Sequence, residues 1–148
     1  MPQSLSKVYV HLVFSTKNQK NLIDPDIELE LYPYIGKLFR QCDSPLLAVN
    51  SHWNHIHTLF YLSRKYSISE VVGTIKKISS KWIKTKGRIY QSFYWQNGYG
   101  AFSINQSHVD AVKHYISNQK IHHRKTSYRD EYIHLLEKYN IDYDEKYV

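Results

Sequence analysis

The sequence predicts an α+β domain in which helices cover one face of an antiparallel sheet. Three observations favour this class: 42% of the 148 residues are hydrophobic, strand-like alternation and helical stripes follow one another along the chain, and no repeat or linker divides it. A chain of this length is typical of one domain. We therefore expect a single domain over residues 1–148, with its core at about 5–125 and a helical tail at about 126–148.

The first strand and the first helix follow from local patterns. Residues 7–16 are apolar at both alternating positions, as in a central strand of a sheet. Asp24 can cap a helix, Pro25 suits its first position, and apolar residues then recur at helical spacing as far as Phe39. Pro33 lies inside this pattern, so the helix either bends there or restarts there.

A hairpin and a second helix are expected next. Residues 46–51 and 55–62 are predicted strands joined by a short turn at 53–54. A capping box at 67–70 then opens a helix with one apolar stripe, which extends to about Lys84.

The last elements complete the predicted arrangement. Residues 93–95 and 99–102 are short strand candidates on either side of the turn signal Asn97-Gly98. The capping pattern at 107–110 opens a further helix, and a last helix is expected at 128–139. Up to the fourth strand, this order is the ferredoxin-like (RRM-like) arrangement, and the helix after it is an additional C-terminal element.

The cysteine content and the hydropathy pattern exclude two kinds of protein. Cys42 is the only cysteine, so neither an intramolecular disulfide nor a cysteine-based zinc site can form, and we expect a reducing, cytoplasmic location. The apolar runs are far shorter than the ~20 residues of a membrane-spanning helix. The N-terminal segment lacks the apolar core of a signal peptide, so we expect neither membrane insertion nor export.

The charge balance favours a polyanionic partner. The chain has 20 Lys and Arg residues against 13 Asp and Glu residues, a net charge of +7, together with 14 tyrosines and 3 tryptophans. Basic groups pair with phosphates, and aromatic rings stack on unpaired bases. Single-stranded nucleic acid is therefore a suitable partner, although a solvated basic surface has the same composition.

Two pairs of residues could carry chemistry. His55 and His57 are two apart on a predicted strand, so both imidazoles lie on one face, as metal ligands or as hydrogen-bonded structural histidines. Tyr115 and Gln119 are four apart in the helix that begins near residue 107, so they share one helical face. Taken alone, a tyrosine in this position is more often a core or surface aromatic.

Together these residues resemble the single-tyrosine HUH transposases, small enzymes of bacterial insertion sequences whose relatives include transposases associated with repetitive extragenic palindromes (REP). The resemblance covers about residues 5–125. It lies in the His-hydrophobic-His triplet at 55–57, the Tyr-x-x-x-Gln pair at 115–119, the segments 11–14 and 95–103, and Asn118-Gln119 leading to His122-His123.

The resemblance implies a reaction and a set of residues for it. The family cleaves and rejoins single-stranded DNA beside imperfect hairpins through a 5′-phosphotyrosine intermediate, which Tyr115 would form. His55, His57 and Gln119 would hold a divalent metal, Mg²⁺ or Mn²⁺. The resemblance also implies a homodimer, in which no residue pattern decides whether Tyr115 serves its own site or that of the partner.

Basic and aromatic residues are candidate DNA contacts, because phosphates pair with cations and bases stack on rings. The candidate phosphate contacts are Lys76, Lys77, Lys81, Lys84, Lys86, Arg88, Lys113, Lys120, Arg124 and Lys125. Trp95 and Tyr99 are candidate stacking residues, and core packing is the alternative interpretation for Trp82 and Trp95.

Two other functions are possible for a basic domain with paired histidines. A non-catalytic, single-stranded nucleic-acid-binding module of RRM-like fold remains the alternative, although the sequence shows no Gly-Phe-Gly-Phe-like motif on a central strand. A two-histidine phosphoesterase requires His-x-Thr or His-x-Ser twice. Leu59 occupies the second position after His57, which excludes that class.

Overall fold

A four-stranded antiparallel sheet forms the centre of the molecule. The computed structural model describes residues 3–148. The strands lie in the order β2 (Leu46–His52), β3 (His55–Tyr61), β1 (Tyr9–Ser15) and β4 (Gly100–Ile104), and β1 pairs with both β3 and β4. This topology confirms the predicted α+β class, with the first strand at the centre of the sheet.

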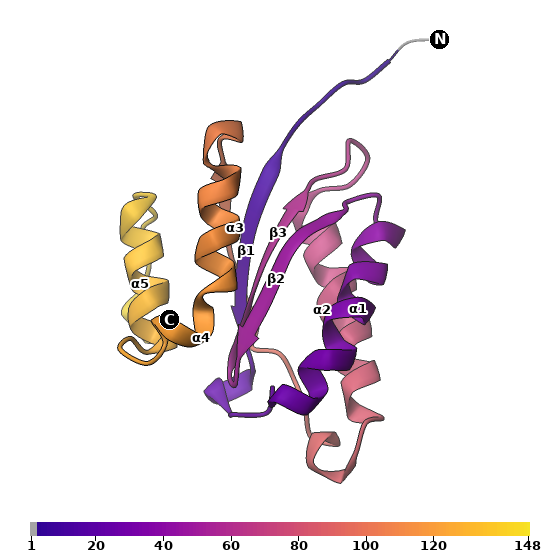
Figure 1. Cartoon of the computed structure of the whole chain (residues 1–148), viewed down its shortest axis with the longest axis vertical. Helices are drawn as coiled ribbons and strands as arrows, with labels where there is room; N and C mark the ends of the chain where they lie inside the picture. The colour runs from indigo at the N-terminus through magenta and orange to yellow at the C-terminus, as the bar shows by residue number, and fades with distance from the viewer. Residues whose placement is uncertain (1–2) are drawn as a thin grey trace.

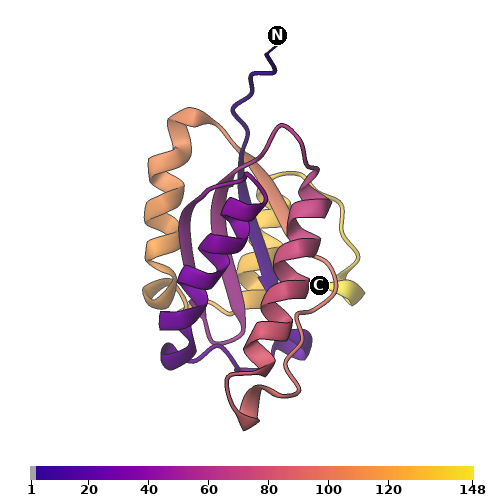
Figure 2. The same ribbon diagram turned by 90° about the vertical axis from the view of Figure 1, so that its right-hand side faces the viewer.

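Helices cover both faces of the sheet (Figures 1 and 2). On one face lie α1 (Pro25–Gln41) and α2 (Ile68–Lys84), the two helices of the ferredoxin-like arrangement. On the opposite face lie α3 (Val109–Ser117), the short α4 (Gln119–His122) and α5 (Tyr128–Lys138). The additional C-terminal helices therefore form a third layer, which the sequence pattern did not place on a face.

Every second residue of the central strands packs into the core beneath α1 and α2. Val10, Leu12 and Phe14 of β1 and Ile56 and Phe60 of β3 belong to the largest hydrophobic core, which also contains the apolar stripes of these two helices. Successive residues of a strand point to opposite faces. The residues between them, including both histidines of β3, therefore face α3, α4 and α5.

Local capping agrees with the sequence in the first two helices. The Asp24 side chain accepts a hydrogen bond from the N–H of Ile27, and α1 runs without interruption through Pro33. The capping box of Ser67 and Glu70 is present at the start of α2. The first helix is therefore one continuous helix and does not restart at Pro33.

Of the two short strands predicted around Asn97-Gly98, the second is confirmed as β4, which pairs with β1. The first is wrong, because Trp95 forms only a single bridge with Thr16 and Phe93 lies in no strand. The Lys76 ammonium donates to the carbonyl oxygens of Gln96 (2.6 Å) and Gly98 (2.8 Å), which holds this loop against α2.

The predicted cap of the helix carrying Tyr115, Ser107 with Asp110, and the predicted shared helix of Tyr115 and Gln119 are wrong. The cap is Asn105, whose side chain accepts from the N–H of Ser107 at 3.0 Å and begins a 3₁₀ turn before α3. The helix then ends at Asn118, whose φ of −95° and ψ of 13° separate α3 from α4. Tyr115 and Gln119 consequently lie on two different helices.

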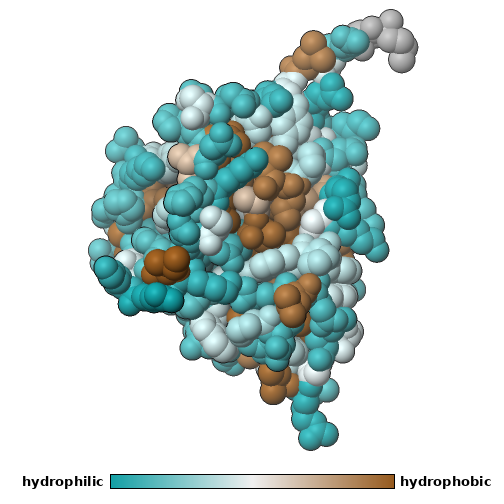
Figure 3. Space-filling view, in the orientation of Figure 1, coloured by the Kyte–Doolittle hydropathy of each residue, from teal (hydrophilic) through white to brown (hydrophobic). Residues whose placement is uncertain are grey.

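The surface seen in Figure 3 is mainly hydrophilic, with a hydrophobic patch beside α3 near the edge strand β2. Leu47 of this strand is 36% exposed, so the two helical layers leave the edge partly open. Within residues 3–148, no helix combines the length and apolar character needed to cross a bilayer.

Candidate functional site

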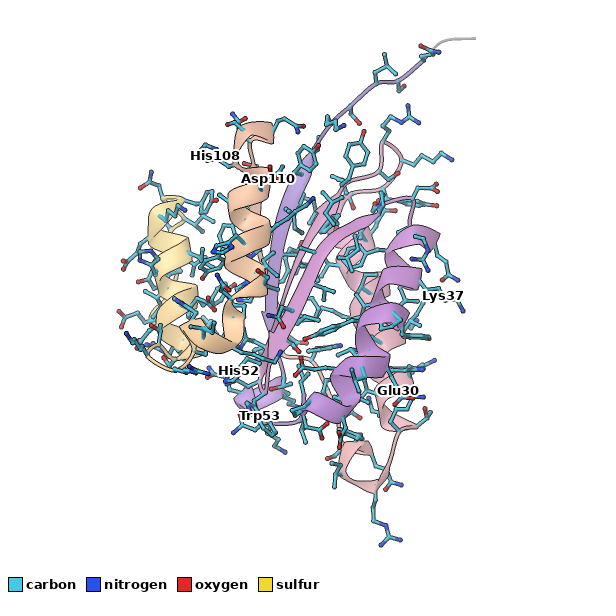
Figure 4. All side chains as sticks on the ribbon, in the orientation of Figure 1. Glu30, Lys37, His52, Trp53, His108 and Asp110 are labelled. Atoms are coloured by element: carbon cyan, nitrogen blue, oxygen red, sulfur yellow. The ribbon has the colours of Figure 1, made fainter. Side chains whose placement is uncertain are left out.

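The predicted site residues meet between the sheet and α3, α4 and α5. The site lies toward the end of the sheet where β2 turns into β3 at His52 and Trp53, beside α4 (Figure 4). His52 stacks on His123 with ring centroids 5.7 Å apart, which connects this turn to the segment after α4.

His55 and His57 stand side by side on the face of β3 that α4 and α5 cover. Both side chains are fully buried, and their ring centroids are 5.2 Å apart. The Nε2 atom of His55 lies 3.2 Å from Oε1 of Gln119. Burial lowers the pKa of His55 to about 4, so this imidazole is neutral at pH 7 and can offer a lone pair.

Gln119 opens α4 and points into the site because the chain bends at Asn118. Its amide nitrogen donates to Oε2 of Glu131 at 2.9 Å, which leaves its oxygen facing His55. Asn50 of β2 donates to the carbonyl of Ile116 at 2.9 Å and holds the end of α3 against the sheet. The bend therefore brings the amide to the histidines.

Tyr115 reaches the same place from α3. Its ring centroid lies 5.9 Å from that of His57, and its hydroxyl donates a hydrogen bond to Glu131. Burial, together with the negative charge of Glu131, raises the pKa of the Tyr115 hydroxyl well above its usual value. All four side chains of the predicted catalytic and metal set, Tyr115, His55, His57 and Gln119, are thus brought together.

Glu131 of α5 lies at the centre of this cluster and was not predicted from the sequence. Its Oε1 atom is 2.9 Å from Nε2 of His57, 2.9 Å from Nε2 of His123 and 3.5 Å from Nε2 of His55. Burial alone would raise the pKa of Glu131, but the hydrogen bonds to His123, His55 and His57 outweigh burial and hold it well below the usual range. The carboxylate is therefore ionised.

The cluster has the donor set of a metal centre. The ligand atoms of His55, His57, His123 and Glu131 all lie within 4.8 Å of one another. Imidazole nitrogens and a carboxylate oxygen suit divalent transition metals, and a carboxylate also suits harder cations. The residues present thus fit a divalent metal.

His11 supports the cluster from the central strand. Its Nε2 atom lies 2.8 Å from Nδ1 of His57, and its side chain is buried. Burial, and then the proximity of His57, lowers the pKa of His11 to about 3. The neutral His11 is hydrogen-bonded to Nδ1 of His57, and this contact orients the His57 ring so that its Nε2 atom points at Glu131.

Weak sequence signals existed for the residues that were missed. His123 follows Gln119 closely and belongs to a histidine pair within the recognised pattern. Glu131 is spaced three residues after Tyr128 and four before Leu135, and all three are buried on the inner face of α5. An acidic residue on an apolar helical stripe is unusual, and this anomaly could have indicated it.

The candidate DNA contacts are distributed over both helical layers. Lys77, Lys81 and Arg88 are exposed in α2 and the segment after it, on the face of the sheet opposite to His55 and His57. The exposed Arg124 lies instead just after α4, near the site. The structure therefore does not gather the basic candidates around the histidines.

Four of the candidates have partners within the chain. Lys76 binds the two loop carbonyls described above, and Lys84 donates to Oγ of Ser80 at 2.8 Å. Lys120 pairs with Glu28 at 2.7 Å, and Lys86 pairs with Glu30 at 3.4 Å. These contacts hold the ammonium groups at fixed positions on the protein surface.

The two aromatic candidates differ in exposure. Trp95 is 7% exposed, packs on Phe14 and donates from Nε1 to Ser79, so its ring belongs to the core and is not available to stack on a base. Tyr99 is 38% exposed and lines a cavity with Tyr128 and Tyr132.

Comparisons with known proteins concern the family and the fold of this chain. A family model described as "Transposase IS200 like" matches residues 4–119. A crystal structure from Deinococcus radiodurans R1, of a protein assigned as a transposase, aligns with a TM-score of 0.63 and 18% identity over 80% of this chain and 98% of that chain.

A second solved structure is that of a REP-associated tyrosine transposase bound to a REP hairpin. It aligns with a TM-score of 0.62 and 17% identity over 83% of this chain and 73% of that chain. At these identities, the two structures demonstrate a shared fold. No curated protein sequence gives a significant match.

Proposed function

Since this chain belongs to the IS200-like transposase family, we propose that it cleaves and rejoins single-stranded DNA through a covalent bond between Tyr115 and a 5′ phosphate. The observation that best supports the proposal is a convergence of side chains. The Tyr115 hydroxyl, the Gln119 amide and the imidazole of His57 all contact one buried carboxylate, that of Glu131.

The proposed reaction exchanges one phosphate ester for another. The Tyr115 oxygen attacks the phosphorus, the bond to the 3′ oxygen breaks, and this oxygen leaves with a proton as a free 3′ hydroxyl. A 3′ hydroxyl can later attack the same phosphorus and displace the tyrosine, which regenerates the phenol. The ester bond is conserved throughout, so no nucleotide cofactor is required.

A divalent metal, for which we propose Mg²⁺ or Mn²⁺ held by His55, His57 and Gln119, would neutralise the charge that develops on the phosphate oxygens during attack. Tyr115 contributes the nucleophilic oxygen. Because its proton is directed at Glu131, the lone pairs of that oxygen are left for a phosphorus approaching from the other side.

We further propose that the substrate contains imperfect hairpins and that the protein acts as a homodimer in the cytoplasm. The REP hairpin bound to one structural neighbour supports the hairpin proposal. The exposed basic residues Lys77, Lys81, Arg88 and Arg124 are proposed phosphate contacts, with Tyr99 as a proposed stacking residue. Light scattering would test the homodimer.

Adduct formation tests the reaction. Labelled single-stranded hairpin DNA is incubated with the full chain and Mn²⁺ or Mg²⁺ and is then separated on a denaturing gel. We expect a protein–DNA adduct with the unmodified chain, no adduct with Tyr115→Phe, and a normal yield with Tyr66→Phe, a matched change at a tyrosine that is 40% exposed.

Mass spectrometry should then find the nucleotide on the peptide containing Tyr115. An adduct that persists in Tyr115→Phe would place the nucleophile elsewhere. Binding of the hairpin without adduct formation by the unmodified chain would favour the alternative function, a non-catalytic nucleic-acid-binding module.

A further inference from the structure

Two side chains of the cluster come from a part of the chain that the family model does not match. The match ends at residue 119, whereas His123 and Glu131 lie beyond it. Their Nε2 and Oε1 atoms are 2.9 Å apart, and the same Oε1 atom is 2.9 Å from Nε2 of His57. The C-terminal segment therefore enters the site formed by the matched region.

The hydrogen bonds of the Nδ1 atoms of His55 and His123 determine which nitrogen of each ring faces Glu131. His123 Nδ1 lies 2.6 Å from the carbonyl oxygen of Thr126, which can only accept, so Nδ1 carries the proton. His55 Nδ1 likewise lies 2.9 Å from Oδ1 of Asn54. The Nε2 atoms of His55 and His123 are therefore the ones that point at the Glu131 carboxylate, at 3.5 and 2.9 Å from its Oε1 atom.

Three ring nitrogens, the Nε2 atoms of His55, His57 and His123, converge on this one carboxylate oxygen, and a bound metal replaces any proton that its ligands carry. The His55 and His123 rings are only 4.4 Å apart, so two imidazolium ions here would repel each other in a buried site. One divalent cation would satisfy both nitrogens and the carboxylate at once. Glu131 would also supply the negative charge that His55, His57 and Gln119 lack.

The separations measured from the Glu131 oxygen are close to those between ligands of one cation. Ligands at about 2.1 Å from one cation lie about 3.0–3.4 Å from each other in octahedral or tetrahedral geometry. The Oε1 atom of Glu131 lies 2.9, 2.9 and 3.5 Å from the Nε2 atoms of His57, His123 and His55. The oxygen of Gln119 lies 3.2 Å from Nε2 of His55 and belongs to the same group.

We propose that His123 and Glu131 are further ligands of the divalent cation, so that the C-terminal segment completes the metal site of this chain. The inference rests on the proposed function for the location of the cation at His55 and His57. It follows that cation binding fastens α5 to the sheet, since β3 and α5 then share one ion. A set of three imidazoles and one carboxylate also favours Mn²⁺ over Mg²⁺.

Binding of Mn²⁺ to the full chain, measured by calorimetry without DNA, tests the ligand set. Glu131→Gln keeps the size and the acceptor for Tyr115 but removes the charge, and His123→Asn removes one nitrogen ligand. We expect each change to weaken Mn²⁺ binding at least ~10-fold. The matched control is Asp130→Asn, which removes an exposed carboxylate from the same helix and should bind Mn²⁺ normally.

A spectroscopic count of nitrogen ligands needs no variant and is independent of catalysis. Pulsed electron paramagnetic resonance of the Mn²⁺-loaded chain should detect three coordinated imidazole nitrogens, and two in His123→Asn. If either variant unfolds, as circular dichroism would show, the count on the unmodified chain still decides whether His123 is a ligand. Two nitrogens in the unmodified chain would overturn the proposal.

The outcomes separate this inference from the proposed function. Mn²⁺ binding that is unchanged in Glu131→Gln, together with a higher adduct yield, would identify Glu131 as a carboxylate that blocks the site, and the proposal would be wrong. Persistence of the adduct in Tyr115→Phe would instead refute the proposed function. Normal Mn²⁺ binding by His57→Ala would refute the location of the cation that both share.

Discussion

Replacing His11 by phenylalanine should weaken the metal site without removing any ligand. Within residues 3–148, the contact with Nε2 of the buried His11, at 2.8 Å, is the only hydrogen bond of Nδ1 of His57, and Nε2 of His57 faces Glu131. When Nε2 of His57 binds a metal, Nδ1 carries the proton and donates to His11. Phenylalanine preserves the ring volume but offers no acceptor. Either a buried N–H of His57 loses its partner, or the proton moves to Nε2 and blocks the lone pair that faces the cluster.

The magnitude follows from these two outcomes. A buried donor without an acceptor costs about 1–3 kcal/mol, which corresponds to about 5- to 150-fold in a binding constant if the cost falls on the loaded state. Loss of a hydrogen bond that orients a ligating histidine typically weakens metal binding about 10–100-fold. We therefore expect Mn²⁺ binding by His11→Phe to be about 10–100-fold weaker.

Calorimetric titration of the full chain with Mn²⁺ checks this expectation. His11→Gln should recover most of the affinity, because its amide oxygen can accept from His57, whereas a general packing defect would not be repaired by it. His134→Phe, at an exposed histidine of α5, is the matched control and should bind normally. Affinity of His11→Phe within about twofold of the unmodified chain would refute the positioning argument.

Two further predictions concern the stability of the metal-free chain. Burial lowers the pKa of His11 to about 3 and of His55 to about 4, from 6.5. As the pH falls, the unfolded chain therefore takes up these protons before the folded chain does. The free energy of unfolding should fall by about 1.4 kcal/mol per proton per pH unit as the pH drops below 6.5. Urea titrations that show constant stability down to pH 4 would contradict this. Gly100→Ala would place Cβ 2.6 Å from the ring of Tyr132 in α5 and should lower the free energy of unfolding by about 1–3 kcal/mol. The control Gly73→Ala in α2 places its Cβ with no described atom within 4 Å and should raise this free energy by up to about 1 kcal/mol. Equal urea midpoints of the two variants would disprove the clash.

Local patterns in the sequence were sufficient to predict which side chains share a face of a strand and where the first two long helices begin. The two-residue period places His55 and His57 on one side of a strand, and the caps at Asp24 and Ser67 locate the starts of the first two long helices. These features depend on interactions between neighbours in the chain, so they can be read without knowing the fold. The predictions around Trp95 and Ser107 failed where longer-range contacts with Thr16 and an earlier cap at Asn105 prevailed.

The sequence by itself determined the α+β class and the shared face of His55 and His57, because periodicity is a local property. Tyr115 and Gln119 were identified by the family resemblance, since they lie on two different helices. Only the tertiary structure decided that α5 packs on the sheet face that carries these histidines and that Glu131 contacts them there. The bend at Asn118 and the turn that follows it reverse the chain, and the direction of such a reversal depends on packing against β2 and β3. Residues 74 positions apart, such as His57 and Glu131, therefore meet for reasons that no local pattern contains.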